Sequence, residues 1–247
     1  MPKRIIKALK NAKSKANKES IFGFVVDNKE MLIKALGIAV IVVIIYSGFC
    51  VFQSHQAKKY SAILHESLIS QQKGDIKLAK EKLEQINQAK FVPANVYALA
   101  SIRYAGFFLD EGDKIKASEI YLQVSECFYC NDYLVDLAGL LAINTLMSDE
   151  ELMKKDLSNQ INKIFKNAKS LKWHIAEQRG FYEIQKENYQ LADKIFKEIE
   201  SDEEVDKSLK SRAQDAQKIL LQKGYKAKDL SKSNDKKSEQ KKTEDKS

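Results

Sequence analysis

The strongest constraint on this chain is a run of eighteen residues, 35–52, without a charged side chain. Eleven of the eighteen are Leu, Ile, Val or Phe, and each of these contributes roughly −0.3 to −0.6 kcal/mol near the centre of a bilayer. A helix that also includes residues 31–33, with Lys34 snorkelling at its edge, is long enough to cross the hydrocarbon core. The alternative is a buried core helix, but soluble helices of this length usually carry a polar face. The sequence therefore predicts one transmembrane helix over residues 31–53, including Ala35, Leu36, Val40, Ile44 and Phe52.

Charge is distributed unevenly along the 247 residues. Residues 1–30 hold eight Lys or Arg against three acids, a net charge of +5, and residues 226–247 hold eight Lys against five acids, a net of +3. The positive-inside rule then places the N-terminus in the cytoplasm and the C-terminal domain in the periplasm of a bacterial cell. Residues 31–225 are neutral overall, so nucleic acid is not an expected partner. We expect a single-pass protein of the bacterial inner membrane with a cytoplasmic basic arm over residues 1–30.

The N-terminal region leaves two questions open. Residues 3–18 place Ile5, Leu9, Ala12 and Ala16 at helical spacing among lysines, so this segment either lies on an anionic membrane surface or is a solvated arm that sets the orientation. A cleaved signal peptide competes with an uncleaved anchor. Because the apolar run is longer than a usual signal sequence and no Ala-x-Ala pattern follows it, we expect an uncleaved signal anchor.

From residue 55 to residue 224, apolar residues recur every three to four positions, which is the spacing of helices. The turns Gly74-Asp75 and Gly112-Asp113 are 38 residues apart, and an alanine follows each glycine after five residues. A similar pattern of turn and alanine ends at Ala192. Small residues on both sides of a turn allow two helices to cross closely. The sequence therefore predicts repeated helix pairs over residues 54–225.

The repeat is less regular between residues 133 and 168. There Ser148 and Glu151 predict a capping box that starts a longer second helix, and Ser201 and Glu204 predict another that opens a final helix. We expect that helix to carry its apolar residues on one stripe and to end at Gly224. The members of the stripe are Val205, Leu209, Ala216 and Ile219. The lysine-rich tail, 226–247, has one leucine and no aromatic residue, so we expect it to be disordered.

The motif Cys127-Phe128-Tyr129-Cys130 has the most chemical potential in the chain. Redox-active CxxC motifs follow a strand and begin a helix, and that context is missing here. A structural disulfide or two packed thiols are therefore preferred to a redox role. The histidines are scattered, no phosphate loop or dinucleotide fingerprint occurs, and no metal site is expected. We expect a protein that is not an enzyme, with no cofactor and no small-molecule substrate.

The last unit, with Trp173, Gly180, Tyr189, Ala192 and Phe196, resembles a tetratricopeptide repeat (TPR). The resemblance implies an all-α fold, in which a single transmembrane helix is followed by a TPR-like right-handed helical-repeat domain, or α-solenoid. One face of each first helix would then line a concave peptide groove. The candidate contacts are Leu64, Leu68, Leu99, Ile102, Leu109, Phe181 and Ile184. The alternative is that these side chains form the core.

The segments on both sides of the apolar run, 24–33 and 53–61, are similar to the start of the YfgM-like family of ancillary subunits of the SecYEG translocon. This resemblance implies association with the translocon and with periplasmic folding factors, where the domain assists exported proteins. Membrane lipid is the other expected partner. Two alternatives stay open, a structural scaffold of another cell-envelope complex and a CxxC thiol redox protein.

Overall fold

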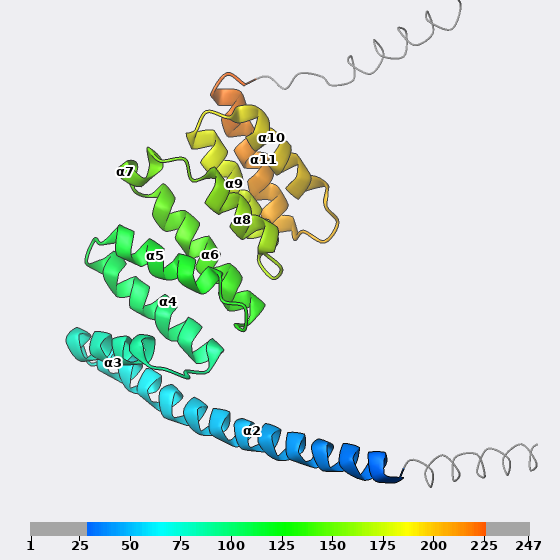
Figure 1. The fold of residues 1–247 in the computed structure, drawn as a ribbon. Helices are drawn as coiled ribbons and strands as arrows, with labels where there is room; N and C mark the ends of the chain where they lie inside the picture. Colours follow the sequence, from blue (N-terminus) through cyan, green and yellow to red (C-terminus); the bar gives the residue numbers. More distant parts are fainter. Residues whose placement is uncertain (1–28, 226–247) are drawn as a thin grey trace, which may run out of the picture. The chain divides into compact units, whose positions relative to one another are not determined.

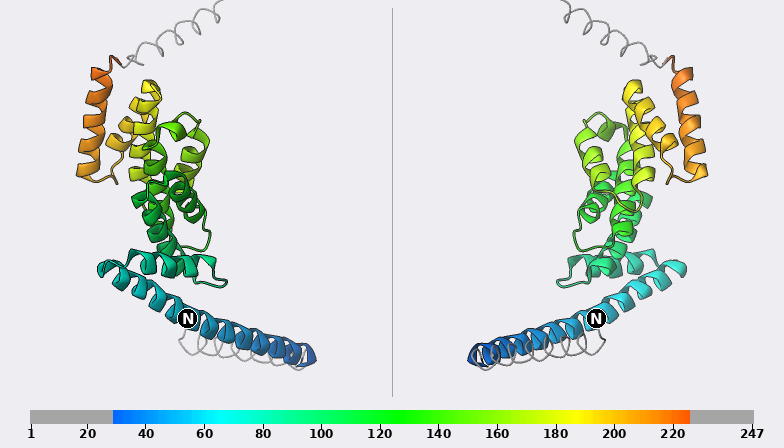
Figure 2. Two further views of the ribbon diagram at one scale, coloured as in Figure 1. Left: turned by 90° about the vertical axis from the view of Figure 1, so that its left-hand side faces the viewer. Right: turned by 90° about the vertical axis from the view of Figure 1, so that its right-hand side faces the viewer.

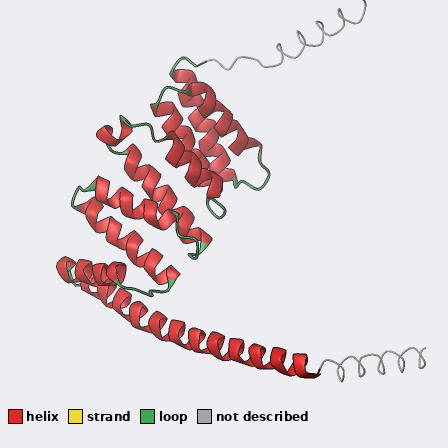
Figure 3. Cartoon of the chain, in the orientation of Figure 1, coloured by secondary structure: helices red, strands yellow, loops and turns green. Residues whose placement is uncertain are grey.

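The computed structural model describes residues 29–225, and the regular structure in this range is helical, with no strand among these residues, as Figure 1 and Figure 3 show. The all-helical prediction is confirmed for this part of the chain. The helices are α2 (Lys29–Gln72), α3 (Ile76–Gln88), α4 (Ala94–Asp110), α5 (Lys114–Ser125), α6 (Asp132–Met147), α7 (Glu150–Met153), α8 (Ser158–Asn167), α9 (Lys172–Gln185), α10 (Tyr189–Ser201) and α11 (Lys207–Gln222). Except for the first two residues of α2, the predicted basic arm lies outside the described residues, as does the predicted tail.

The chain divides into two compact units, Met1–Lys58 and Lys59–Ser247. In the first unit, α2 carries the apolar run, and among the described helices it is the one long and apolar enough to cross a membrane. Its most apolar window is 0% buried. Four of the predicted span residues are between 42% and 66% exposed, namely Leu36, Val40, Ile44 and Phe52. The core helix of a soluble protein would be mostly buried, so this exposure disagrees with that alternative.

In the second unit each helix packs mainly on its neighbours in the chain, an order that Figure 2 shows from two sides. Helix α4 packs on α3 and α5, α6 packs on α5 and α9, and α10 packs on α9 and α11. The short helices α7 and α8 lie against α6 and α9. Five clusters of buried residues follow one another through these layers, and the last turns of α2 share the first cluster with α3 and α4. The core is therefore a series of local contacts.

The predicted glycine turns have the backbone that the sequence requires. Gly74 and Gly112 have φ values of 81° and 83°, in the left-handed region that glycine adopts without steric cost. The aspartates that follow, Asp75 and Asp113, each accept a hydrogen bond from the backbone N–H three residues further on, at 3.1 and 2.9 Å. They cap α3 and α5 in the same way. Gly224, with φ of 82°, ends α11 as predicted.

The small residues that the repeat places at helix crossings lie where the helices approach most closely. The alanines are 0% exposed, at Ala79, Ala105, Ala117 and Ala192. In the first pair, the Ser67 hydroxyl donates a hydrogen bond of 3.1 Å to the carbonyl of Ala79. In the last pair, Gly180 lies against the ring of Phe196, and a β-carbon built at Gly180 would be 2.6 Å from Cζ of that ring. Larger side chains would force these pairs apart.

Both predicted capping boxes are wrong. Ser148 ends α6, and the next helix, α7, has only four residues and is capped by Asp149. Ser201 is the last residue of α10, and α11 begins later, behind the cap Asp206. In both places the side chain that accepts hydrogen bonds from the free backbone N–H groups is an aspartate, Asp149 or Asp206.

The buried stripe of α11 differs from the predicted one at a single position. Val205, Leu209 and Ala216 are buried as predicted, whereas Ile219 is 39% exposed. Leu220, only 1% exposed, takes the place expected for Ile219. Leu220 lies four residues after Ala216 and so shares its face of the helix. The stripe prediction therefore fails by one residue at its C-terminal end.

A β-carbon at Gly180 should destabilise the second unit. The Gly180→Ala variant would place that carbon 2.6 Å from the buried Phe196 ring, so we expect the free energy of unfolding to fall by about 1–3 kcal/mol. Urea denaturation of the full chain, followed by circular dichroism, measures it. Gly106→Ala in α4 is the matched control, since no heavy atom lies within 4 Å of its new β-carbon, and it should gain about 0.5–1 kcal/mol. Equal effects at the two positions would contradict the close crossing.

Substitutions at the turn of the last pair and at an earlier turn should change the free energy of unfolding in opposite directions. Glu187 has φ of 60° where the earlier pairs have glycine, and this conformation costs a residue with a β-carbon about 1–2 kcal/mol. Glu187→Gly should therefore raise the free energy of unfolding by up to about 1 kcal/mol, and Gly112→Ala at the equivalent turn should lower it by a similar amount. Thermal unfolding compares the two variants. A less stable Glu187→Gly protein would show that this turn is not strained.

Candidate interaction surface

Six of the seven residues predicted to line a peptide groove lie in the core or pack against it. Leu64 is only 7% exposed, and the other six are half-buried. They belong to separate clusters. Leu64 and Leu99 pack with α2–α4, Ile102 and Leu109 pack with α4–α6, and Phe181 and Ile184 pack with α9–α11. Leu68 is half-buried on α2. Membership of different clusters does not test whether these side chains line one groove, and such a groove stays a prediction.

Cys127 and Cys130 are joined by a disulfide in the loop between α5 and α6. The sequence left open a structural disulfide or two packed thiols, and the structure contains the disulfide. Cys130 is 8% exposed, and its sulfur lies 3.3 Å from the carbonyl oxygen of Ala94 at the start of α4. This is a packing contact, because a disulfide sulfur has no hydrogen to donate. The disulfide therefore holds the loop against the preceding helix pair.

The two residues between these cysteines point away from the domain. Phe128 is 88% exposed and Tyr129 is 85% exposed. Their rings meet edge to face, with centroids 5.1 Å apart. The predictions from this motif concerned only its cysteines, and the exposure of the two rings was not predicted. The spacing of the cysteines could have indicated this exposure. Two residues between bonded cysteines have too short a backbone for their side chains to reach the core.

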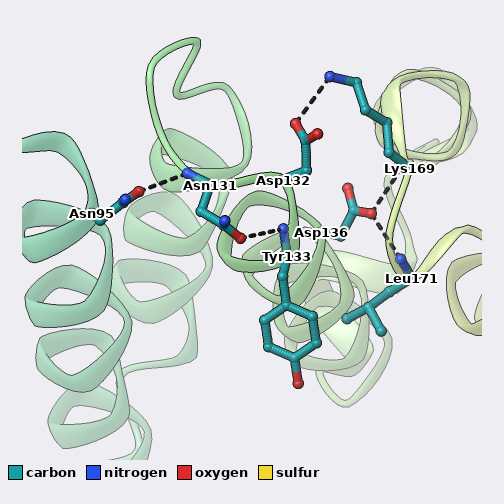
Figure 4. A network of polar contacts seen from close by, with 7 residues as sticks. All are labelled: Asn95, Asn131, Asp132, Tyr133, Asp136, Lys169 and Leu171. Atoms are coloured by element: carbon teal, nitrogen blue, oxygen red, sulfur yellow. Dashed lines mark hydrogen bonds and ion pairs between the residues drawn. The ribbon is translucent and has the colours of Figure 1, made fainter.

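A network of polar contacts, shown in Figure 4, fixes the position of this loop. The backbone N–H of Asn131 donates to Oδ1 of Asn95 on α4, at 2.7 Å, and the Asn131 side chain caps α6. On the other side, Asp136 accepts hydrogen bonds of 2.8 Å from the backbone N–H groups of Lys169 and Leu171. Asp136 is only 3% exposed, so these bonds compensate for the burial of its carboxylate. Both flanking helix pairs therefore hold the start of α6.

Two ion pairs beside the loop neutralise its neighbouring carboxylates. Glu126 lies 2.6 Å from the ammonium of Lys163, and Asp132 lies 2.9 Å from that of Lys169. All four side chains are more than half exposed, so each pair contributes at most about 1 kcal/mol to stability. Each pair joins one positive and one negative side chain, so neither pair adds net charge to the surface beside the loop.

The loops between helix pairs follow one another along one edge of the second unit, on the right-hand side of Figure 1. Contacts support this order, since Asn95 beside the first loop binds Asn131 in the second, and Asp136 binds the backbone of the third. The α3–α4 loop also exposes an aromatic side chain, Phe91, to 72%. Exposed aromatic residues on the loop edge therefore contrast with the buried residues of the predicted groove.

A pocket of about 390 Å³ lies further along this edge. Its lining residues are Lys169, Ser170, Lys172, Trp173, His174, Asp202, Glu204, Val205, Asp206 and Leu209. The ammonium of Lys172 is 4.9 Å from the centre of the Trp173 ring. Cations and carboxylates both line the pocket, so its charge selects neither an anion nor a cation. Within residues 29–225, no group of three His, Cys, Asp or Glu side chains could hold a metal ion.

The cap of α11 at this pocket should make stability depend on pH. The backbone N–H groups of Leu209 and Ser208 donate to the Asp206 carboxylate, and these bonds, with the charges of His174 and Arg212, hold the pKa of Asp206 below its usual 3.8. Because the folded pKa is the lower one, the ionised carboxylate stabilises the fold above pH 3.8, and this stability is lost as the pH falls through the folded pKa.

Asp206→Ala should therefore lower the melting temperature at pH 7, and its difference from the unsubstituted chain should shrink as the pH falls well below 3.8. Thermal unfolding at a series of pH values measures this. Glu203→Ala, in the same loop but outside the cap, is the control and should leave the pH profile unchanged. A constant difference at every pH would contradict the role of the ionised cap.

No family model, curated protein or solved structure matches this chain. The function must therefore be inferred from the residues and contacts described above.

Proposed function

We propose that this chain is a membrane-anchored protein-interaction module, with a TPR-like right-handed helical array as its interaction domain. The observation that carries the proposal is the combination of two parts in one chain. Helix α2 is long and apolar enough to span a membrane and its apolar window is unburied, while the second unit buries its own core through successive helix contacts. A layered array of this kind exposes a large surface for its size and needs no catalytic centre to act.

Repeated local geometry supports the TPR-like arrangement. Two turns 38 residues apart have the same left-handed glycine and the same aspartate cap. Ser67 and Ala79 in the first pair correspond in spacing to Gly180 and Ala192 in the last, and both alanines are 0% exposed. Stacked helix pairs of one design form an extended protein-binding surface in repeat proteins.

The similarity of segments 24–33 and 53–61 to the YfgM-like family makes the SecYEG translocon and periplasmic folding factors the first partners to test. In this proposal the basic N-terminus stays in the cytoplasm of a bacterial cell, and the helical domain lies in the periplasm. The domain then assists exported proteins without catalysing a reaction. A compartment that permits disulfides agrees with the bonded Cys127 and Cys130.

Two acidic substitutions in the span should abolish membrane anchoring. Val42 and Val43 are apolar and 57% and 61% exposed, and an aspartate at the centre of a membrane helix costs about 2.5–3.5 kcal/mol. The Val42→Asp/Val43→Asp chain should leave the membrane pellet on alkaline carbonate extraction, while the unsubstituted chain stays there. Ile115→Asp/Leu221→Asp adds the same charge at two positions of the second unit that are 56% and 63% exposed, and as the matched control it should stay in the pellet. If the span variant stayed in the pellet, α2 would not be the anchor.

Orientation and partners need separate measurements. A phosphatase fused after Ser247 is active only in the periplasm, so an inactive fusion would reverse the proposed topology. Crosslinking in cells, followed by purification from solubilised membranes, tests the partners. Another envelope protein in place of the translocon and folding factors would remove the secretion assignment and keep the interaction function. A chain that copurified with no protein would contradict both.

A further inference from the structure

We propose that the disulfide-closed loop of Cys127, Phe128, Tyr129 and Cys130, here called the aromatic loop, docks into an apolar pocket on a folded protein partner. This inference rests on the proposed protein-interaction function and names the contact and the kind of partner. It differs from the groove expected by analogy with TPR proteins, because six of the seven candidate groove residues lie in the core or pack against it.

Exposure is the first observation. Phe128 and Tyr129, at 88% and 85%, are the most exposed large apolar side chains in the part of the chain that the structure describes. The highest value in the apolar run of α2 is 71%, for Val51. Two adjacent aromatic rings exposed to this degree on a soluble domain are a binding feature, because each ring removes about 150–250 Å² from water when it is covered.

Rigidity is the second observation. The disulfide closes the loop between α5 and α6, and Cys130 packs against the start of α4. Asn131 and Asp136 then bind the neighbouring helix pairs on both sides. The loop is therefore ordered before a partner arrives, and its entropy cost is met during folding rather than during binding.

The shape of the loop defines the partner. Side chains that project this far cannot enclose an extended chain, so the loop is unsuited to holding an unfolded client. Its complement is a concave apolar site on a folded protein that accepts one or both rings. Aromatic anchors in such pockets supply most of the affinity of many interfaces, and a polar rim excludes water around them. Here Glu126, Asn131 and Asp132 form polar neighbours of the loop.

Charge favours a protein over a lipid surface. Segments that bind anionic membranes combine apolar side chains with an excess of lysine or arginine. Beside the aromatic loop, Lys163 and Lys169 are each paired with a carboxylate, at 2.6 and 2.9 Å. Because a carboxylate compensates each of these two lysines, the pairs add little attraction to anionic headgroups.

Site-specific photocrosslinking in cells identifies the partner. A benzophenone amino acid is placed at position 128 or 129 of the full chain, and at Leu221 as a control that is also apolar and 63% exposed. We expect one protein adduct from positions 128 and 129 that is absent from position 221. Peptide mapping of that adduct should place the attachment inside an apolar pocket of the partner.

Binding of the purified partner to the chain in nanodiscs then tests the energetics. Phe128→Ala and Tyr129→Ala should each weaken binding at least tenfold. Tyr133→Ala removes a side chain that is 51% exposed on α6, outside the loop, and should change binding by less than about threefold. Cys127→Ser/Cys130→Ser keeps both rings but loses the closed loop, and should weaken binding about tenfold. Circular dichroism shows whether the helices of each variant are intact.

Four results would overturn the proposal. A lipid adduct from positions 128 and 129 would make the loop a membrane contact, and an adduct with a second copy of the chain would make it a self-association site. If protein adducts formed only from other surface positions, the interaction function would survive and the aromatic loop would not be its contact. If binding were unchanged in both ring variants with intact helices, the rings would not be anchors.

Discussion

The second unit depends on the close approach of paired helices. At each crossing the side chains are among the smallest available, so that Ser67 reaches the backbone at Ala79, and Gly180 lies against the ring of Phe196. Dispersion attraction is effective only at such short range, so an added β-carbon at the crossing would separate the helices and weaken their packing. Turns with the required backbone keep each pair together, because Gly74 and Gly112 reverse the chain without strain and Asp75 and Asp113 cap the next helix.

A core made of local layers has consequences for the surface. The buried residues of each cluster come from three or four helices that are near in sequence, so the apolar faces of the helices pack against neighbouring helices. Exposed apolar side chains of the second unit therefore include several that lie on loops. The disulfide-closed loop between α5 and α6 is one of them, and its two aromatic rings are exposed. Asn131 and Asp136 bind the neighbouring helix pairs on both sides of this loop. The protein therefore combines a buried scaffold with a rigid, apolar projection.

The uncharged run in α2 differs from the apolar faces of the second unit, because it is not buried by the protein. Its side chains are exposed and apolar over the window that is long enough to cross a bilayer. In water such a surface is unfavourable, and a hydrocarbon environment removes the cost. The same hydrophobic effect that orders the second unit through burial thus favours a membrane for the first. In the proposed function this separates anchoring from binding, since no residue of the span is needed for the interaction surface.

The sequence by itself determined the helical class, the apolar run of α2, the glycine turns and the small residues at the crossings. These features depend on local properties, namely the 3.6-residue period, the backbone freedom of glycine and the absence of charge. Only the tertiary structure decided which aspartates cap α7 and α11, why Leu220 rather than Ile219 is buried, and where the predicted groove residues lie. It also decided that the rings of Phe128 and Tyr129 project. Burial at these positions depends on how each segment packs against the neighbouring helices, and the periodicity of one segment does not contain that information.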